Sequence, residues 1–441
     1  MLVKISLGQV CFFITSLIYI IRASKDPSLN NVLEVISNQY NAKRNDDNSF
    51  GRQNSMSKST VDIHLDPDVN KNLTELILSQ GYPSETYTVQ TSDGFLLDLH
   101  RIPHGRKGSH FNYRKNSKGV VYLQHALLSS ACDWVLNFAD DSLGFILADA
   151  GYDVWMGNSR GNTYSRKHAT LDPNNPKFWD WSFDEMAKYD VPAFLEFVLN
   201  ETGETSLYYI GHSQGTTMAF ALFSQRPDIR KKIKLFVALA PVAHINYIKS
   251  PIKYLAEFPD QLLYDTFGRR DFLPNNDILK FLVDTFCGDV LTRWVCYNQL
   301  FLFSGFDLSN LNQSRLQVYM NHSPAGVSTK DMVHFAQMHR EQKFMMYNFG
   351  SAKENEKYYN QTEPPTYDLT QVDVPVVAFT STNDWLSDPQ DVAELFKTLP
   401  NLKAKYEIQG WNHIDFTWGM DAAKRCYGTI LQWLVQFQKA K

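Results

Sequence analysis

Residues 207–222 read LYYIGHSQGTTMAFAL and place Ser213 between two glycines, after an aromatic and aliphatic run and before a helix-forming one. The pattern predicts a strand, a tight turn and a helix. A plain glycine-rich turn is one interpretation. The other is a nucleophile elbow, a strained strand-to-helix turn that holds the serine exposed. In that case Gly211 and Gly215 are needed because larger side chains would collide with the tightly packed backbone. Partners elsewhere in the chain must decide between the two.

Predicted strands and helices alternate on both sides of this turn. Residues 182–203 form a long predicted helix, and Ser182 stands three residues before Glu185 as a capping box. Apolar strands that alternate with helices predict a mainly parallel central sheet with helices on both faces, which is an α/β fold. The other segments with this pattern are residues 84–103, 119–128, 144–161, 233–241, 374–384, 404–413 and 422–438.

The alternation stops between residues 244 and 368, where Phe, Leu, Tyr and Pro are frequent. We predict that this segment is an inserted, mainly helical cap or lid with an apolar underside, because sheet strands resume after it. A separate second helical domain is the alternative. On the first interpretation, residues 61–243 and 369–441 form the α/β core.

The N-terminal region has the layout of a targeting signal. Lys4 precedes an uncharged and mostly apolar run over 5–21, and small residues follow at Ala23 and Ser24. This predicts a secretory signal peptide over 1–24. The length of the run and Arg22 leave an uncleaved signal anchor as the alternative. Residues 25–60 are polar and predict a disordered linker or pro-segment.

Glycosylation motifs agree with a lumenal location. Asn-x-Ser/Thr sequons make predicted acceptors of Asn72, Asn200, Asn312 and Asn360. A fifth, at Asn321, is followed by Pro324 and is a poorer acceptor. A signal of this kind sends a chain to secretion or to the lysosomal lumen, and it does not distinguish the two.

The five cysteines fit an oxidising compartment. Cys11 lies in the predicted signal, while Cys287 and Cys296 are close together, which suits a local disulfide. Cys132 and Cys426 have no obvious partners. We expect two buried free thiols, with a bridge between them as the alternative.

Composition excludes several classes of function. Of the 441 residues, 44% are hydrophobic and 20% are charged, which is ample for a globular core. A net charge of -4 without a basic cluster gives no reason to expect nucleic acid or an anionic membrane as partner. His334 and His339 are five residues apart, which is poor spacing for a metal, and residues 157–162 lack the spacing of a phosphate loop. We therefore expect no metal and no cofactor.

A catalytic serine needs a base, and the base needs an acid to orient it. In a parallel sheet such groups stand in loops at the carboxyl ends of strands. The predicted strand near residue 380 is followed by Asp384 and Asp388, and Asp388 precedes Pro389 in a helix-capping position. Asp384 is therefore the better acid. The next strand leads to His413, so the order Ser213, Asp384, His413 matches that of an α/β-hydrolase. The N–H group of Gln214 would be one oxyanion donor.

With these residues placed, the chain resembles the acid lipase family, the group of gastric and lysosomal lipases with insect and nematode relatives. The resemblance spans about 62–437 and rests on LQHALLSS, DVWMGNSRGNTYSRKH, FWDWSFDEMAKYDVPAF, YYIGHSQGTT, NDWLSDPQDV and WNHIDFTWG, among other stretches. It implies an α/β-hydrolase core with a cap and lid. It also implies hydrolysis of lipid esters, such as triacylglycerol or cholesteryl ester, at a lipid–water interface, without metal or coenzyme.

Carried over by residue, the resemblance makes Ser213 the nucleophile, Asp384 the acid and His413 the base. It also implies that Leu127 is the second oxyanion donor beside Gln214, and that Cys287 and Cys296 form a cap disulfide. A cleaved signal implies no stable membrane insertion.

Two departures stand out. Ala126 occupies a position that is usually glycine in the family, and if that position needs a positive φ the alanine costs about 1 kcal/mol and tilts the Leu127 N–H. Ser381 and Thr382 also replace frequent glycines, without expected consequence. A catalytically silent lipid-binding or storage relative, and an esterase for small soluble esters, are the alternative functions.

Overall fold

The computed structural model describes residues 66–106, 117–275, 301, 303–307 and 309–439. The predicted signal, the 25–60 segment and the Cys287–Cys296 pair lie outside the described residues. Residues 65–441 form one compact unit.

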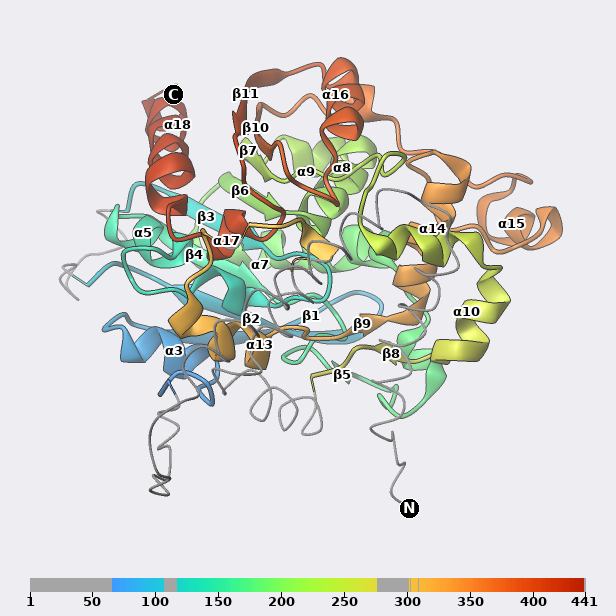
Figure 1. Cartoon of the computed structure of the whole chain (residues 1–441), viewed down its shortest axis with the longest axis horizontal. Helices are drawn as coiled ribbons and strands as arrows, with labels where there is room; N and C mark the ends of the chain where they lie inside the picture. Colours follow the sequence, from blue (N-terminus) through green and yellow to red (C-terminus); the bar gives the residue numbers. More distant parts are fainter. Residues whose placement is uncertain (1–65, 107–116, 276–300, 302, 308, 440–441) are drawn as a thin grey trace, which may run out of the picture. The chain divides into compact units, whose positions relative to one another are not determined.

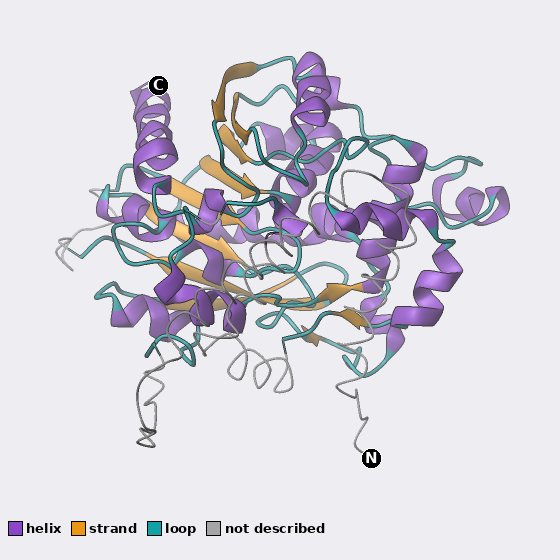
Figure 2. Cartoon of the chain, viewed as in Figure 1, coloured by secondary structure: helices purple, strands orange, loops and turns teal. Residues whose placement is uncertain are grey.

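A nine-stranded sheet forms the centre of this unit (Figures 1 and 2). The pairs from β4 to β11 are parallel, and β1, β2 and β5 pair in antiparallel fashion. This arrangement confirms the predicted α/β class with a mostly parallel sheet. The strands are, in spatial order, β1 (Glu85–Gln90), β2 (Phe95–Ile102), β4 (Asp153–Gly157), β3 (Val120–Gln124), β6 (Leu207–His212), β7 (Ile233–Leu239), β10 (Val376–Ser381) and β11 (Leu402–Ile408), with β5 (Lys167–His168) beside β2.

The central strands are buried along their whole length because helices cover both faces of the sheet. Tyr208 and Ile210 face a core shared with α3 (Leu73–Ser79), α5 (Leu143–Asp149) and α18 (Gly428–Lys439). Tyr209, the residue between them, packs its ring against Tyr122 of β3 and Phe223 of α8 (Gln214–Gln225) on the opposite face. Since side chains alternate along a strand, each face receives every second residue.

The last strand departs from the predicted apolar pattern. In β11 exposed and half-buried residues alternate, with Lys403, Lys405 and Glu407 exposed. β11 has a neighbour on one side only, and charged residues on such an edge strand oppose pairing with another chain.

The helix predicted over 182–203 is present but not uniform. Ser182 and Glu185 form the expected capping box at the start of α6 (Phe183–Glu185). A π-helical turn, η3 (Met186–Asp190), then leads into α7 (Val191–Thr202). Pro192 lacks the N–H that a regular helix would use, and its ring crowds the carbonyl four residues earlier. The wider π turn just before it accommodates the proline.

The described part of residues 244–368 is mainly helical. In the sequence it is inserted between β7 and β10, two strands that pair directly with each other in the sheet. In Figure 1, α10, α14 and α15 gather beyond one end of the sheet. The one strand pair in the described part is the short antiparallel pair β8–β9, and a single antiparallel bridge joins Met345 to Thr366. The elements are η4 (Pro251–Glu257), α10 (Asp260–Phe267), β8 (Asp271–Phe272), η5 (Gln313–Arg315), α13 (Leu316–His322), β9 (Val327–Ser328), α14 (Thr329–Glu341) and α15 (Ala352–Tyr359).

The remaining helices lie between the sheet strands or follow the last of them. They are α9 (Pro227–Arg230), η1 (Ala131–Trp134), η2 (Pro176–Trp179), η6 (Leu369–Gln371), α16 (Pro389–Thr398), α17 (Asp415–Trp418) and the π turn η7 (Ala423–Tyr427). The last of these leads directly into α18, so the predicted C-terminal helix is present with a π turn at its start.

Cys132 and Cys426 are both free and buried, as expected. Among the sequons, Asn72, Asn200 and Asn360 are exposed and Asn312 is half-buried. Asn321 is 3% exposed, which agrees with its ranking as the poorest acceptor. Glycosylation itself stays a prediction.

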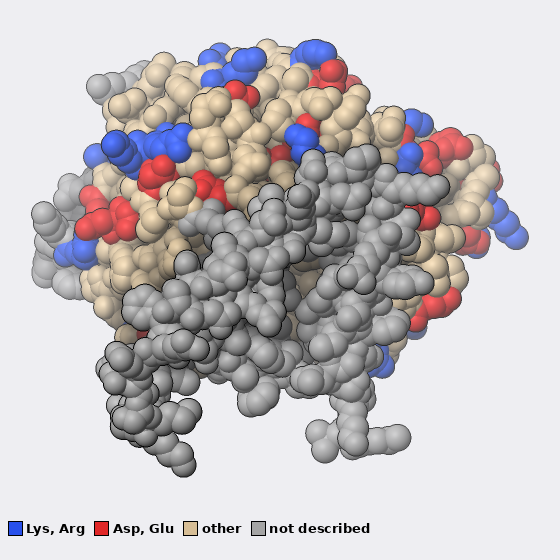
Figure 3. Space-filling view, viewed as in Figure 1, with Lys and Arg blue, Asp and Glu red and all other residues tan. Residues whose placement is uncertain are grey.

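The surface carries both signs of charge. Figure 3 shows small groups of Lys and Arg beside groups of Asp and Glu on the visible described surface. Within the described ranges, no helix is both long and apolar enough to cross a bilayer.

Candidate active site

Ser213 is the single residue between β6 and α8. Its backbone has φ 53° and ψ -118°, which is strained for a residue with a side chain. The Ser213 N–H donates to the Leu239 carbonyl at 3.0 Å, and its carbonyl accepts from Thr216 N at 2.7 Å. These bonds hold the turn in its strained form, with the serine at the carboxyl end of the central strand.

Two glycines permit this turn, as predicted. A Cβ atom on Gly215 would collide with the carbonyl oxygen of Gln124 and lie 3.0 Å from that of His125. A Cβ atom on Gly211 would lie 2.8 Å from the carbonyl carbon of Gly215. The loop that follows β3 therefore packs directly on the first turn of α8, where no side chain fits between them.

The structure brings Ser213, His413 and Asp384 together, although the serine and the histidine are 200 residues apart. His413 Nε2 lies 2.7 Å from Ser213 Oγ, and His413 Nδ1 lies 2.9 Å from both carboxylate oxygens of Asp384. A carboxylate only accepts, so it favours the tautomer with the proton on Nδ1, and Nε2 is left to accept from the serine. The three residues are 7%, 4% and 1% exposed, in that order.

Hydrogen bonds with backbone groups hold Asp384 and His413 in place. Asp384 Oδ1 accepts from the N–H groups of Leu386 at 2.9 Å and Ser387 at 2.8 Å. The N–H of His413 donates to the carbonyl of Ser304 at 3.1 Å, and His212 Nε2 lies 2.9 Å from the carbonyl of His413. Burial lowers the pKa of His212 to about 3, so this neighbouring ring is neutral and adds no positive charge.

Asp388, the alternative acid, has a different position. It is the N-cap of α16, where its Oδ1 accepts from Gln390 N at 2.9 Å, and its Oδ2 pairs with Lys249 Nζ at 2.8 Å. The Asp388 carboxylate therefore has a structural role, because it caps α16 and pairs with Lys249.

The two predicted oxyanion residues lie on the elements that meet at Gly215. Gln214 is the first residue of α8, so its N–H has no partner within the helix. Leu127 stands in the loop after β3, next to Leu128, which has φ 59°. The positive φ therefore falls at Leu128 and not at Ala126. The alanine that replaces the usual glycine causes no backbone strain from a positive φ.

Three buried carboxyl groups lie around the loop of Leu127, Gln214 and His413. Spacing in the sequence gave no sign of them. Asp133 accepts from Ser129 Oγ in the loop of Leu127, Asp331 accepts from the Gln214 side chain, and Asp415 accepts from Asn412 N, next to His413, at 2.6 Å. Burial raises the pKa of Asp133 and of Asp331 to about 7, and that of Asp415 to about 8.

The Asp415 carboxyl should make stability depend on pH in an unusual direction. In the unfolded chain it ionises near pH 3.8, whereas in the fold it keeps its proton to about pH 8. Between these values the folded state binds more protons, so stability falls as pH rises, by up to about tenfold in the unfolding constant per pH unit. Asp415→Asn cannot ionise. We expect its stability to rise relative to wild type from pH 5 to pH 7, measured by urea unfolding. A difference that stays constant over this range would contradict a raised pKa.

His334 and His339 have structural partners. His334 Nδ1 lies 3.0 Å from Ser182 Oγ and its Nε2 lies 2.9 Å from the carbonyl of Met345, while His339 Nδ1 lies 2.6 Å from the carbonyl of Ile245. Over the described ranges, no group of three or more His, Cys, Asp and Glu side chains is placed to hold a metal.

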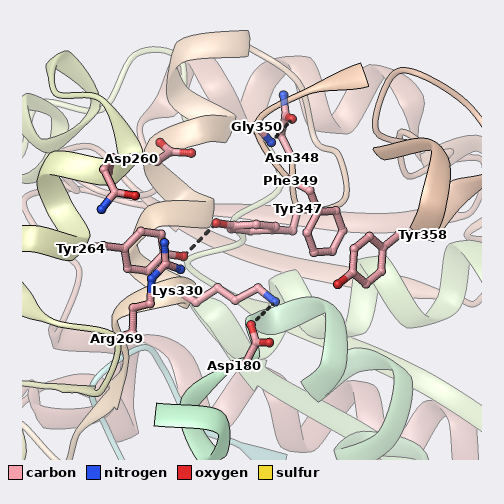
Figure 4. Close-up of a pocket in the computed structure, with 11 residues that line it drawn as sticks. Asp180, Asp260, Tyr264, Arg269, Lys330, Tyr347, Asn348, Phe349, Gly350 and Tyr358 are labelled. Carbon is pink, nitrogen blue, oxygen red and sulfur yellow. Dashed lines mark hydrogen bonds and ion pairs between the residues drawn. The ribbon is translucent and has the colours of Figure 1, made fainter. Parts of the chain in front are cut away.

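A polar pocket of about 400 Å³ lies on the other side of α14 (Figure 4). Lys330 points into it and pairs with Asp180 at 2.8 Å, and Tyr264 and Tyr347 join their hydroxyl groups at 2.8 Å. Consecutive residues of α14 thus face different regions, because Lys330 lines this pocket and Asp331 contacts Gln214.

Comparison with known proteins agrees with this geometry. Residues 119–419 match the model of the alpha/beta hydrolase fold, and residues 73–138 match that of a partial alpha/beta-hydrolase lipase region. The fold is therefore that of an α/β hydrolase.

The chain is also similar to named lipases along most of its length. It is 48% identical over 374 residues to lysosomal acid lipase/cholesteryl ester hydrolase of Homo sapiens, which covers 85% of this chain and 93% of that protein. It is 48% identical over 370 residues to gastric triacylglycerol lipase of Mus musculus, covering 84% and 93%. The chain belongs to the acid lipase family, which confirms the resemblance found in the sequence.

Proposed function

We propose that this protein is a lipase, a carboxylic ester hydrolase that acts on neutral lipids such as triacylglycerol or cholesteryl ester. The observation that carries the proposal is the continuous chain from Ser213 Oγ through His413 to Asp384, with steps of 2.7 and 2.9 Å. It occurs in a chain that is 48% identical to a lysosomal acid lipase and to a gastric lipase.

In the proposed mechanism, Ser213 Oγ attacks the ester carbonyl carbon while its proton passes to His413 Nε2. The carbonyl oxygen becomes an oxyanion that accepts from the N–H groups of Gln214 and Leu127. The intermediate collapses, the C–O bond to the alcohol breaks, and His413 gives its proton to the leaving oxygen. Water then attacks the acyl-enzyme with His413 as base, which releases the fatty acid. Asp384 orients the imidazole and stabilises its cationic form throughout.

Residues 244–368 would act as the cap. Their contacts support this role, because Ser304 accepts from His413 N and Ala325 N donates to the Leu128 carbonyl at 2.7 Å. Large hydrophobic side chains of the same segment are exposed, namely Tyr247, Leu262, Leu273 and Tyr358. Exposed hydrophobic side chains of this kind suit contact with a lipid–water interface, where a cap can shift and admit substrate.

The same relatives support entry into the secretory pathway, because their names place them in the lysosome or the stomach. Together with the N-terminal signal and the exposed sequons, they favour a protein that is secreted or delivered to the lysosomal lumen.

The experiment that tests this function compares three substrates: an emulsified long-chain triacylglycerol, an emulsified cholesteryl ester and a short soluble ester. The blank is protein inactivated with a serine-directed phosphonate. We expect fatty acid release from at least one emulsified lipid and none in the blank. Hydrolysis of the soluble ester alone would favour the esterase alternative. Absence of both phosphonate labelling and hydrolysis would favour the catalytically silent one.

A further inference from the structure

Asp331 joins the inserted segment to the nucleophile turn. It lies near the start of α14, is fully buried, and accepts from two donors on the core. Its Oδ2 accepts from the side-chain amide of Gln214, and its Oδ1 accepts from Phe183 N at 2.7 Å. Gln214 is 117 residues earlier in the chain, so this contact exists only when the insertion is docked on the core.

We infer that Asp331 is a positioning residue for oxyanion binding: by holding the Gln214 side chain, it fixes the direction of the Gln214 N–H. The inference rests on the proposed function, since it gives Asp331 a part in the same reaction. It assigns to the insertion a direct contribution to the site beyond that of a cover.

The turn at Gln214 needs an external support. The preceding residue, Ser213, has φ 53°, and such strain persists only where surrounding contacts hold it. The Gln214 N–H belongs to the free first turn of α8, so no helical bond fixes its direction. Oxyanion donors act only when they are aimed at the developing charge, and a displacement of about 1 Å can cost a factor of about 100 in rate.

Asp331 is itself well fixed. Its N–H donates to Ser328 Oγ, the N-cap of α14, at 3.0 Å, and that hydroxyl donates to the carbonyl of Trp181. The Asp331 carboxyl also holds Phe183 N, the first residue of α6. The start of α14 is thereby tied to residues 181–183 of the core, so it can hold Gln214 in one place.

The charge of Asp331 suits this position. Burial raises its pKa to about 7, and repulsion from Asp184 and Glu185 of α6 acts in the same direction. Below that pH the carboxyl is neutral, so it places no negative charge beside the developing oxyanion. A neutral carboxyl still accepts from Phe183 N, and the Gln214 amide can either donate to it or turn over and accept from it. An asparagine at this position should therefore serve as well.

The neighbouring Lys330 provides a matched control. It lies on the same helix and is 7% exposed, but its ion pair with Asp180 faces the pocket of Figure 4. Lys330→Met removes a part-buried polar contact of α14 without touching Gln214.

The test measures kcat and KM for p-nitrophenyl butyrate, and the rate of labelling by a serine-directed phosphonate. The variants are Asp331→Ala, Asp331→Asn, Gln214→Met, the double variant Asp331→Ala/Gln214→Met and Lys330→Met, with Ser213→Ala as the blank. We expect Asp331→Ala to lower kcat about 10- to 100-fold with little change in KM. Asp331→Asn should restore most of the rate. The double variant should be no slower than Gln214→Met, because Asp331 acts through that side chain.

Other outcomes overturn the inference. They are an unchanged kcat in folded Asp331→Ala, an equal loss in Lys330→Met, or losses that multiply in the double variant. If Asp331→Ala does not fold, Gln214→Met decides, because an unchanged kcat there removes the basis of the inference. A wild type that cleaves the soluble ester but no emulsified lipid refutes the lipase function alone, and the variants still decide the role of Asp331. A wild type without Ser213-dependent turnover or labelling overturns both.

Discussion

Ser213→Ala is expected to lower kcat for ester hydrolysis by about 10⁶-fold, the loss typical of removing the nucleophile from a serine–histidine–aspartate site. Without Oγ no acyl-enzyme forms, and His413 Nε2 loses the partner 2.7 Å away. The fold should persist, because Ser213 contributes its backbone and not its side chain to the strained turn. The measurement is fatty acid or nitrophenol release together with phosphonate labelling, with circular dichroism to show that the variant is folded.

A buried serine whose side chain bonds other residues than the triad gives the control. Ser165 Oγ donates to the carbonyl of Asn158 at 2.9 Å, and Ser165 is fully buried. Ser165→Ala should lose stability and keep its rate per folded molecule. If folded Ser213→Ala kept a substantial share of the wild-type rate, the nucleophile would have to be another group.

Asp384→Asn is expected to lower kcat by about 10⁴-fold while leaving the fold intact. The wild-type carboxylate lies 2.9 Å from His413 Nδ1 and can only accept a hydrogen bond from it. An asparagine amide can donate instead, which favours the tautomer with the proton on Nε2. That ring cannot take the proton of Ser213, and the cation formed in the transition state loses its counter-charge.

Asp388→Asn is the matched control, because Asp388 is the alternative acid four residues away. Asparagine is about as good an N-cap as aspartate, so α16 should remain and kcat should stay near the wild-type value. The assignment of the acid would be reversed if Asp388→Asn lost activity and Asp384→Asn kept it.

Much of the core architecture could be predicted from the sequence because it is encoded locally. The apolar runs of β3, β6 and β10 and the capping box at Ser182 are read from neighbouring residues, and they occur as predicted. The positions of Asp384 and His413 followed from a topological rule, that loops at the carboxyl ends of neighbouring parallel strands lie close together. The structure places both residues in such loops.

The contacts and burial that hold the site residues in place could not be predicted in the same way. The contact of Asp331 with Gln214 spans 117 residues and depends on how the insertion docks, which no periodic pattern records. Asp415 is adjacent to the His413 loop in sequence, but its raised pKa comes from burial, a property of the finished core. The same holds for Leu128, where the positive φ depends on how the loop packs on α8 and under Ala325.

β7 pairs directly with β10, although the insertion separates the two strands in the sequence. This separation delays the moment at which the enzyme becomes reactive. On the proposed mechanism, Ser213 leaves the ribosome 200 residues before its base, a delay of about 10 to 40 s at ordinary rates of synthesis. During that delay the serine has no general base, and its neighbours from the insertion are incomplete. The order of the chain thus keeps a growing molecule chemically inert toward surrounding lipids until His413 has been made.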